Sequence, residues 1–107
     1  MENWRLNHLE ELLKEDPKDE FVHYALAQEY IKQENYEEAI KRFDILKSLN
    51  PDYLGLYYHL AAAQIEADLP EDAMTTYETG ITIAKKIGDQ HALSELLNAK
   101  TNLDLGL

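Results

Sequence analysis

Residues 20–53 read EFVHYALAQEYIKQENYEEAIKRFDILKSLNPDY, and residues 54–87 read LGLYYHLAAAQIEADLPEDAMTTYETGITIAKKI. A shift of 34 residues superimposes the two stretches. Self-similarity at this period is typical of solenoids, in which each unit buries its apolar face against its neighbours. The sequence therefore predicts a solenoid of stacked units. The matched positions include Tyr24 with Tyr58, Leu26 with Leu60, Ala27 with Ala61, Ile31 with Ile65, Ala39 with Ala73 and Phe43 with Tyr77.

Apolar residues recur at helical spacing along the chain, and the sequence has no strand pattern. Asp19 and Asn35 are suitable N-caps, and Glu38 follows Asn35 at the spacing of a capping box. Pro70 suits the first turn of a helix, where its missing N–H would have no partner in any case. We expect six helices joined by short turns, at residues 4–15, 19–33, from Asn35 to Asn50, 53–67, from Pro70 to Gly88, and 90–105.

The signature residues of the two units fall at regular spacings. They are His23-x2-Leu26-Ala27-x2-Tyr30, Ala39-x3-Phe43 and Pro51 in the first unit, and Tyr57-x2-Leu60-Ala61-x2-Gln64, Ala73-x3-Tyr77 and, in place of proline, Lys85 in the second. The chain thus resembles the tetratricopeptide repeat family, whose pattern is W-x2-L-G-x2-Y, then A-x3-F, then P. The resemblance implies an all-α solenoid of about six helices, paired antiparallel and wound into a right-handed superhelix.

The resemblance also implies how one domain of 107 residues is divided. We expect an N-terminal half-repeat helix at 1–17, a first repeat at 20–53, a second repeat at 54–87 and a C-terminal capping helix at 88–107.

In this family the first helix of each pair lines a concave face that receives peptides or partner segments. The resemblance therefore implies a peptide-binding groove on two helices. The alternative is that the same side chains only pack between neighbouring helices or beneath the sixth helix. The candidate groove residues are Phe21, Tyr24, Gln28 and Ile31 from one helix, and Gly55, Tyr58, His59, Ala62 and Ile65 from the other.

One use of these repeats is a clamp of lysines, asparagines and an arginine that grips the C-terminal carboxylate of chaperone tails. The resemblance puts three clamp positions on Tyr24, Gln28 and His59, and none keeps the clamp residue. The resemblance therefore does not extend to this clamp.

The chain is acidic, with 10 Lys and Arg against 21 Asp and Glu and a net charge of -11. Such a field repels phosphates and anionic headgroups, which argues against nucleic acid and membrane surfaces as partners. The acidity is either that of a solvated surface or that of a site for a basic ligand. In both cases we expect a partner segment that is neutral or basic rather than acidic.

No catalytic or metal-binding pattern emerges from the sequence. Cysteine is absent, and the four histidines do not have the spacing of metal ligands. The glycines form no phosphate-binding loop, and the acidic residues are spread over helix surfaces. We therefore expect no enzyme activity, no metal and no cofactor.

Charged residues interrupt the apolar ones between Met1 and Pro17, so no signal-peptide core is expected there. No stretch approaches the length of a membrane span. We expect a cytoplasmic protein as translated.

Two functional hypotheses remain. The first is a scaffold or interaction module that binds a peptide or partner segment in the concave groove. The second is a structural subunit that forms a homodimer through its groove or its terminal helix, because Leu103, Leu105 and Leu107 make the end of the chain apolar.

Overall fold

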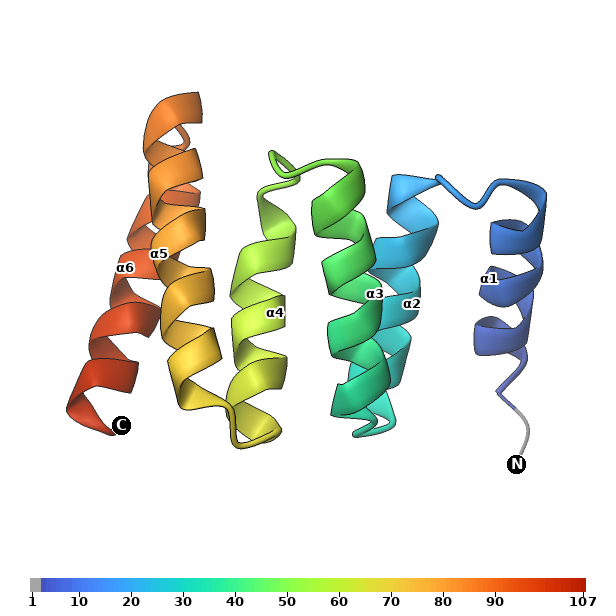
Figure 1. Ribbon diagram of the computed structural model, residues 1–107, viewed down its shortest axis with the longest axis horizontal. Helices are drawn as coiled ribbons and strands as arrows, with labels where there is room; N and C mark the ends of the chain where they lie inside the picture. The colour runs from blue at the N-terminus through green and yellow to red at the C-terminus, as the bar shows by residue number, and fades with distance from the viewer. Residues whose placement is uncertain (1–2) are drawn as a thin grey trace. The chain divides into compact units, whose positions relative to one another are not determined.

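The computed structural model describes residues 3–107, which contain six α-helices and no strand (Figure 1). The helices predicted from the sequence are confirmed to within two residues at each end where a bound was given. They divide into two compact units, with the boundary between Pro51 and Asp52. The first unit holds α1 (Trp4–Glu15), α2 (Glu20–Lys32) and α3 (Tyr36–Leu49), and the second holds α4 (Gly55–Glu66), α5 (Pro70–Ile87) and α6 (Gln90–Leu105).

The structure confirms the helix starts that were predicted from Asp19, Asn35 and Pro70. The side chains of Asp19 and Asn35 cap α2 and α3, accepting hydrogen bonds from the backbone N–H groups of Val22 and Glu38. Pro70 lies in the first turn of α5 and begins that helix without a side-chain cap. Local chemistry therefore sets these starts. The two caps supply an acceptor for a backbone N–H that the helix itself cannot satisfy, and proline has no such N–H.

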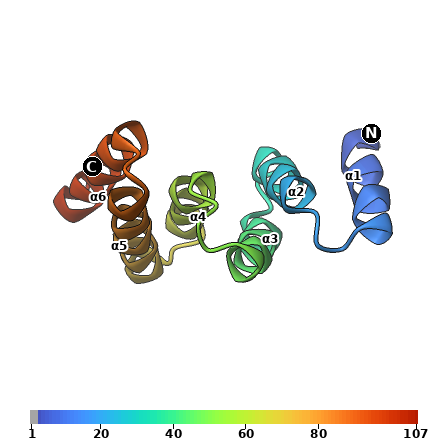
Figure 2. The same cartoon turned by 90° about the horizontal axis from the view of Figure 1, so that it is seen from above.

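The first unit is built on the antiparallel pair of α2 and α3, with α1 packed against α2 (Figure 2). Leu26 of α2 and Phe43 of α3 are fully buried in this pair, and the small side chains of Ala27 and Ala39 let the helices approach closely. Helix α1 contributes buried Leu9, whereas Trp4 is 75% exposed. Trp4 therefore contributes little to the packing of α1.

The second unit repeats this arrangement with α4 and α5. Leu60 is fully buried between them, as the repeat register predicts. The hydroxyl of Thr76 donates a hydrogen bond of 2.7 Å to Oε1 of Gln64, which pairs two buried polar side chains across the two helices. Gly80 lies where α5 passes closest to α4, since a Cβ there would be 2.7 Å from Cβ of Tyr57.

Helix α6 covers the second unit and packs on both α5 and α4. Leu96 is the buried residue of α6, and Leu93 is half-buried. Leu97 is 43% exposed, because it follows Leu96 directly and points about 100° away around the helix. Gly106, with φ of 74°, ends α6 in the left-handed conformation of a helix C-cap.

Candidate functional site

None of the nine candidate groove residues is buried. Four belong to the first unit and five to the second, so each set is described within its own unit. On α2, Phe21 is 64% exposed, and Tyr24, Gln28 and Ile31 are half-buried. Helix α2 therefore offers a partly apolar, partly polar strip to solvent.

Tyr24 is held in place on this strip by two neighbours. Its ring meets the ring of Phe43 edge-on, with centroids 6.1 Å apart. Its hydroxyl accepts a hydrogen bond of 3.1 Å from the amide nitrogen of Gln28, one turn further along α2. The ring is thus fixed by the core on one edge while part of it stays accessible.

The candidate residues of α4 are either exposed or half-buried. Gly55, Tyr58 and Ile65 are exposed, with 41% of Tyr58 and 38% of Ile65 accessible. His59 and Ala62 are half-buried, and the rings of Tyr58 and His59 meet edge-on at 5.5 Å.

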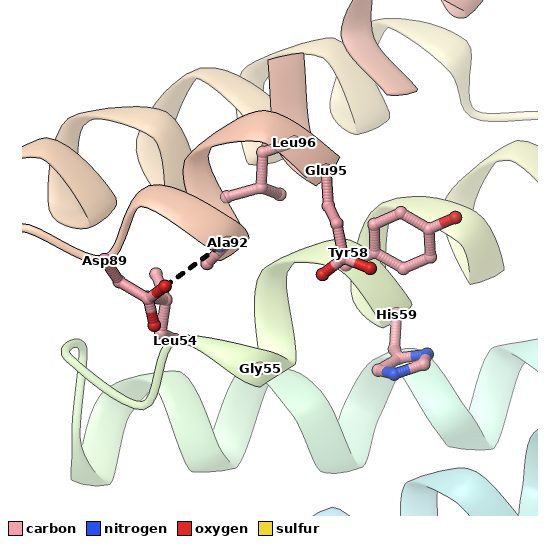
Figure 3. A pocket seen from close by; sticks show the side chains of 8 residues that line it. All are labelled: Leu54, Gly55, Tyr58, His59, Asp89, Ala92, Glu95 and Leu96. Atoms are coloured by element: carbon pink, nitrogen blue, oxygen red, sulfur yellow. Dashed lines mark hydrogen bonds between the residues drawn. The ribbon is translucent and has the colours of Figure 1, made fainter. Parts of the chain in front are cut away.

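A hollow of about 300 Å³ lies between α4 and α6 (Figure 3). We call it the acidic hollow, because Asp89 and Glu95 supply its charged side chains. It reaches the surface, since Gly55, Tyr58 and Glu95 are all exposed. The lining residues are Leu54, Gly55, Tyr58, His59, Asp89, Ala92, Glu95 and Leu96.

The electrostatics of the acidic hollow are negative. No Lys or Arg is among the described residues that line it. Asp89 caps α6 by accepting a hydrogen bond from the backbone N–H of Ala92, drawn in Figure 3, and Glu95 lies 3.5 Å from the exposed ring of His91. Burial lowers the pKa of His59 from its ordinary 6.5, which the carboxylate of Glu95 opposes in part. His59 is therefore neutral at pH 7, and the two carboxylates set the sign of the charge.

A second hollow of about 200 Å³ lies further along the same two helices. We call it the apolar hollow. Tyr58 lines both hollows, so its ring lies at the position where they adjoin. The lining residues of the apolar hollow are Tyr58, Ile65, Tyr77, Ala99, Asn102, Leu103 and Leu107.

Three candidate residues of α4 thus share a hollow with α6, namely Gly55, Tyr58 and His59. From the sequence, the packing of groove residues beneath the sixth helix was an alternative, but no residue of α6 was predicted to be part of the site. A signal was present, since Ala92, Leu96, Ala99 and Leu103 recur at spacings of four, three and four residues, which marks one helical face. That face lines the two hollows along α4.

The size of the hollows limits their chemistry. Pockets that bind small molecules usually have volumes of roughly 300 to 1,000 Å³. At about 300 and 200 Å³, these two suit single side chains of a partner. Between residues 3 and 107, no three His, Cys, Asp or Glu side chains gather closely enough to hold a metal ion. None of the helices in that range combines the length and apolar character needed to cross a membrane.

Comparisons with known proteins agree on the repeat. A family model described as tetratricopeptide repeat matches residues 20–53. A solution structure of a tetratricopeptide repeat domain protein from Salinibacter ruber is 44% identical, with a TM-score of 0.77 over 82% of this chain and 89% of that one. A crystal structure of a tetratricopeptide repeat domain protein from the same organism is 43% identical, with a TM-score of 0.75 over 80% of this chain and 97% of that one.

The likeness extends to a more distant structure. The TPR2B domain of yeast Sti1, solved as a complex with pHsp70, has a TM-score of 0.87 over 95% of this chain and 82% of that one. Its sequence is only 19% identical, so the likeness concerns the fold alone. No curated protein sequence matches this chain significantly.

Proposed function

The chain belongs to the tetratricopeptide repeat family, and on that premise we propose that it is an interaction module that binds a peptide or partner segment on the first helices of its helix pairs. The family is a non-catalytic fold that mediates protein–protein interaction. One observation carries the proposal: α2 and α4 leave aromatic and apolar side chains accessible, including Phe21, Tyr58 and Ile65. These side chains give the first helices of the two pairs an apolar and aromatic surface that a partner segment can cover.

The chemistry of these side chains suits recognition of a peptide. Tyrosine presents a flat apolar ring and one hydroxyl at a modest entropic cost, so it is frequent among residues that dominate binding energy. Tyr24 and Tyr58 occupy equivalent positions in the two repeats. With a net charge of -11, the protein favours a neutral or basic partner segment over an acidic one. A cytoplasmic location also stays part of the proposal.

The test is selection of binding peptides from a random display library against the full chain, followed by measurement of their affinity for variants. Tyr24→Ala and Tyr58→Ala should each weaken binding by about 1 to 4 kcal/mol. Matched controls are Ile45→Ala on α3, 41% exposed, and Ile87→Ala on α5, 50% exposed. If both tyrosine variants bind the peptides as tightly as the wild type does, the binding site does not lie on α2 and α4.

One observation favours a second candidate, self-association through the end of α6. Leu105 is 67% exposed and Leu107 is 86% exposed. Light scattering of the full chain and of a chain ending at residue 103 tests this candidate. A dimer that becomes a monomer on truncation would support it, whereas two monomers would eliminate it.

A further inference from the structure

We propose that the two hollows between α4 and α6 hold two side chains of one extended partner segment, a basic side chain in the acidic hollow and an apolar side chain in the apolar hollow. This inference rests on the proposed function and specifies its ligand. The two hollows adjoin at Tyr58 and lie along the same pair of helices, so one continuous segment reaches both.

Charge complementarity assigns the basic side chain. Asp89 and Glu95 are the charged lining residues of the acidic hollow, and His59 adds no positive charge at pH 7. A guanidinium donates in a planar fork that suits carboxylate oxygens, and its flat face stacks on an aromatic ring such as that of Tyr58. A carboxylate in the same place would face two like charges, with no Lys or Arg among the lining residues to offset them.

The other hollow is lined by four aliphatic side chains together with two tyrosines and Asn102. Ile65 and Tyr77 line it from α4 and α5, and Leu103 and Leu107 line it from α6 and its end. Ile65 and Leu107 are 38% and 86% exposed, so an entering apolar side chain removes apolar surface from water on both partners. The volume of about 200 Å³ accommodates one branched aliphatic side chain.

The geometry of α6 sets the spacing in the partner. Glu95 lines the acidic hollow and Leu103 lines the apolar one, eight residues further along. At 1.5 Å per residue, the two positions are about 12 Å apart along the helix. An extended chain covers about 13 Å in four residues, and side chains four apart point to the same face. The partner therefore carries its basic and apolar side chains four residues apart.

The experiment uses capped synthetic peptides with a Ser and Gly background and amide NMR titration of the full chain. One peptide carries Arg and Leu four residues apart, in both orders. The second replaces Arg with citrulline, which has the same shape without the charge, and the third places Arg and Leu next to each other. We expect the first to bind at least about tenfold more tightly than either of the others, in its better order, with the largest shifts in α4 and α6.

Variants of the protein assign the effect to the carboxylates. Glu95→Gln and Asp89→Asn should each weaken the Arg peptide several-fold and leave the citrulline peptide unchanged. Asparagine keeps the N-cap of α6, so Asp89→Asn changes the charge without uncapping the helix. The matched control is Glu78→Gln, which removes the same charge from an exposed position on α5.

Equal binding of the Arg and citrulline peptides, no response to Glu95→Gln, or no binding of any of these peptides would overturn the inference. The proposed function has a separate readout. Library-selected peptides can bind with an affinity that depends on Tyr24 while the amide signals of α6 do not shift. In that case the inference fails and the proposed function stands. If the library yields no binding peptide, both fail.

Discussion

The two helix pairs, α2 with α3 and α4 with α5, share a register but end differently. Helix α3 has 14 residues and is followed by Asn50 and Pro51. Helix α5 has 18 residues, and Lys85 occupies the position equivalent to Pro51. Without the proline, α5 continues for one more turn and ends at Gly88, whose φ of 85° is left-handed. One residue type therefore decides the length of the helix.

The turns within the pairs are alike in conformation and different in chemistry. Glu34 and Asp68 are 34 residues apart and both have positive φ, at 58° and 63°. After Glu34, the side chain of Asn35 caps α3, whereas after Asp68 no side chain caps α5 and Pro70 begins it. The repeat thus conserves the backbone path while different residues satisfy its requirements.

The largest expected effect comes from the leucines that the two pairs have in common. Leu26→Ala and Leu60→Ala should each lower the free energy of unfolding by about 2 to 5 kcal/mol, because each leucine is fully buried. Chemical denaturation measures both. The exposed Leu69, at 41%, is the control, and Leu69→Ala should cost far less. A loss below about 0.5 kcal/mol at either buried leucine would contradict the shared register.

The next effect tests the difference in helix length. Lys85→Pro should cost about 3 kcal/mol or more, because proline removes a backbone donor within α5 and clashes with the preceding turn. Lys85→Ala, which keeps the helix, should change stability by less than about 0.5 kcal/mol. Circular dichroism and denaturation check both. If Lys85→Pro is as stable as Lys85→Ala, the extra turn of α5 is not needed by the fold.

A smaller effect is expected where α5 passes α4 and α6. Gly80→Ala gains helix propensity, but its Cβ would be 2.7 Å from Cβ of Tyr57 and 3.1 Å from Cδ1 of Leu96. The helices must then shift, and we expect a net loss of about 1 to 3 kcal/mol. Thr79→Ala, at an exposed position on the same helix, is the control. A stabilised Gly80→Ala variant would mean that the helices lie further apart.

The smallest effect concerns the two positive φ angles. Glu34→Gly should stabilise the protein by about 0.5 to 1 kcal/mol, because relief of the left-handed strain exceeds the added flexibility of the unfolded chain. Asp68→Gly should gain less, since Asp tolerates this region better than Glu. Gln33→Gly, where φ is -88°, should instead destabilise. Thermal melts should rank Glu34→Gly above Asp68→Gly, and both above Gln33→Gly. Any other order would contradict the assignment of strain to the two positive φ angles.

Most of the fold was predictable because its signals are local. Caps, prolines and the spacing of apolar residues fix where each helix begins and ends, and Asp19, Asn35 and Pro70 act as expected. The 34-residue register then placed Leu26 and Leu60 in equivalent buried positions. Helical spacing alone does not place Leu97 and Trp4, which are both exposed, because an apolar residue on a short helix need not face the core.

The candidate site was predictable only in part. The register identified accessible residues on α2 and α4. The spacing of apolar residues marks one face of α6, but it does not specify that this face packs beside α4, and the hollows depend on that packing. Asp89 illustrates the difficulty. Its sequence context marks it as a helix cap, and only the packing of α6 brings its carboxylate to the wall of the acidic hollow.

The most direct test of the central claim is an amide NMR map of the full chain with a peptide selected from the random library. Binding by the first helices predicts the largest shift changes on α2 and α4, around Tyr24, Gln28 and Tyr58, with small changes on the sides of α3 and α5 that carry Ile45 and Ile87. Changes confined to those sides of α3 and α5, with Tyr24 and Tyr58 unaffected, would contradict it.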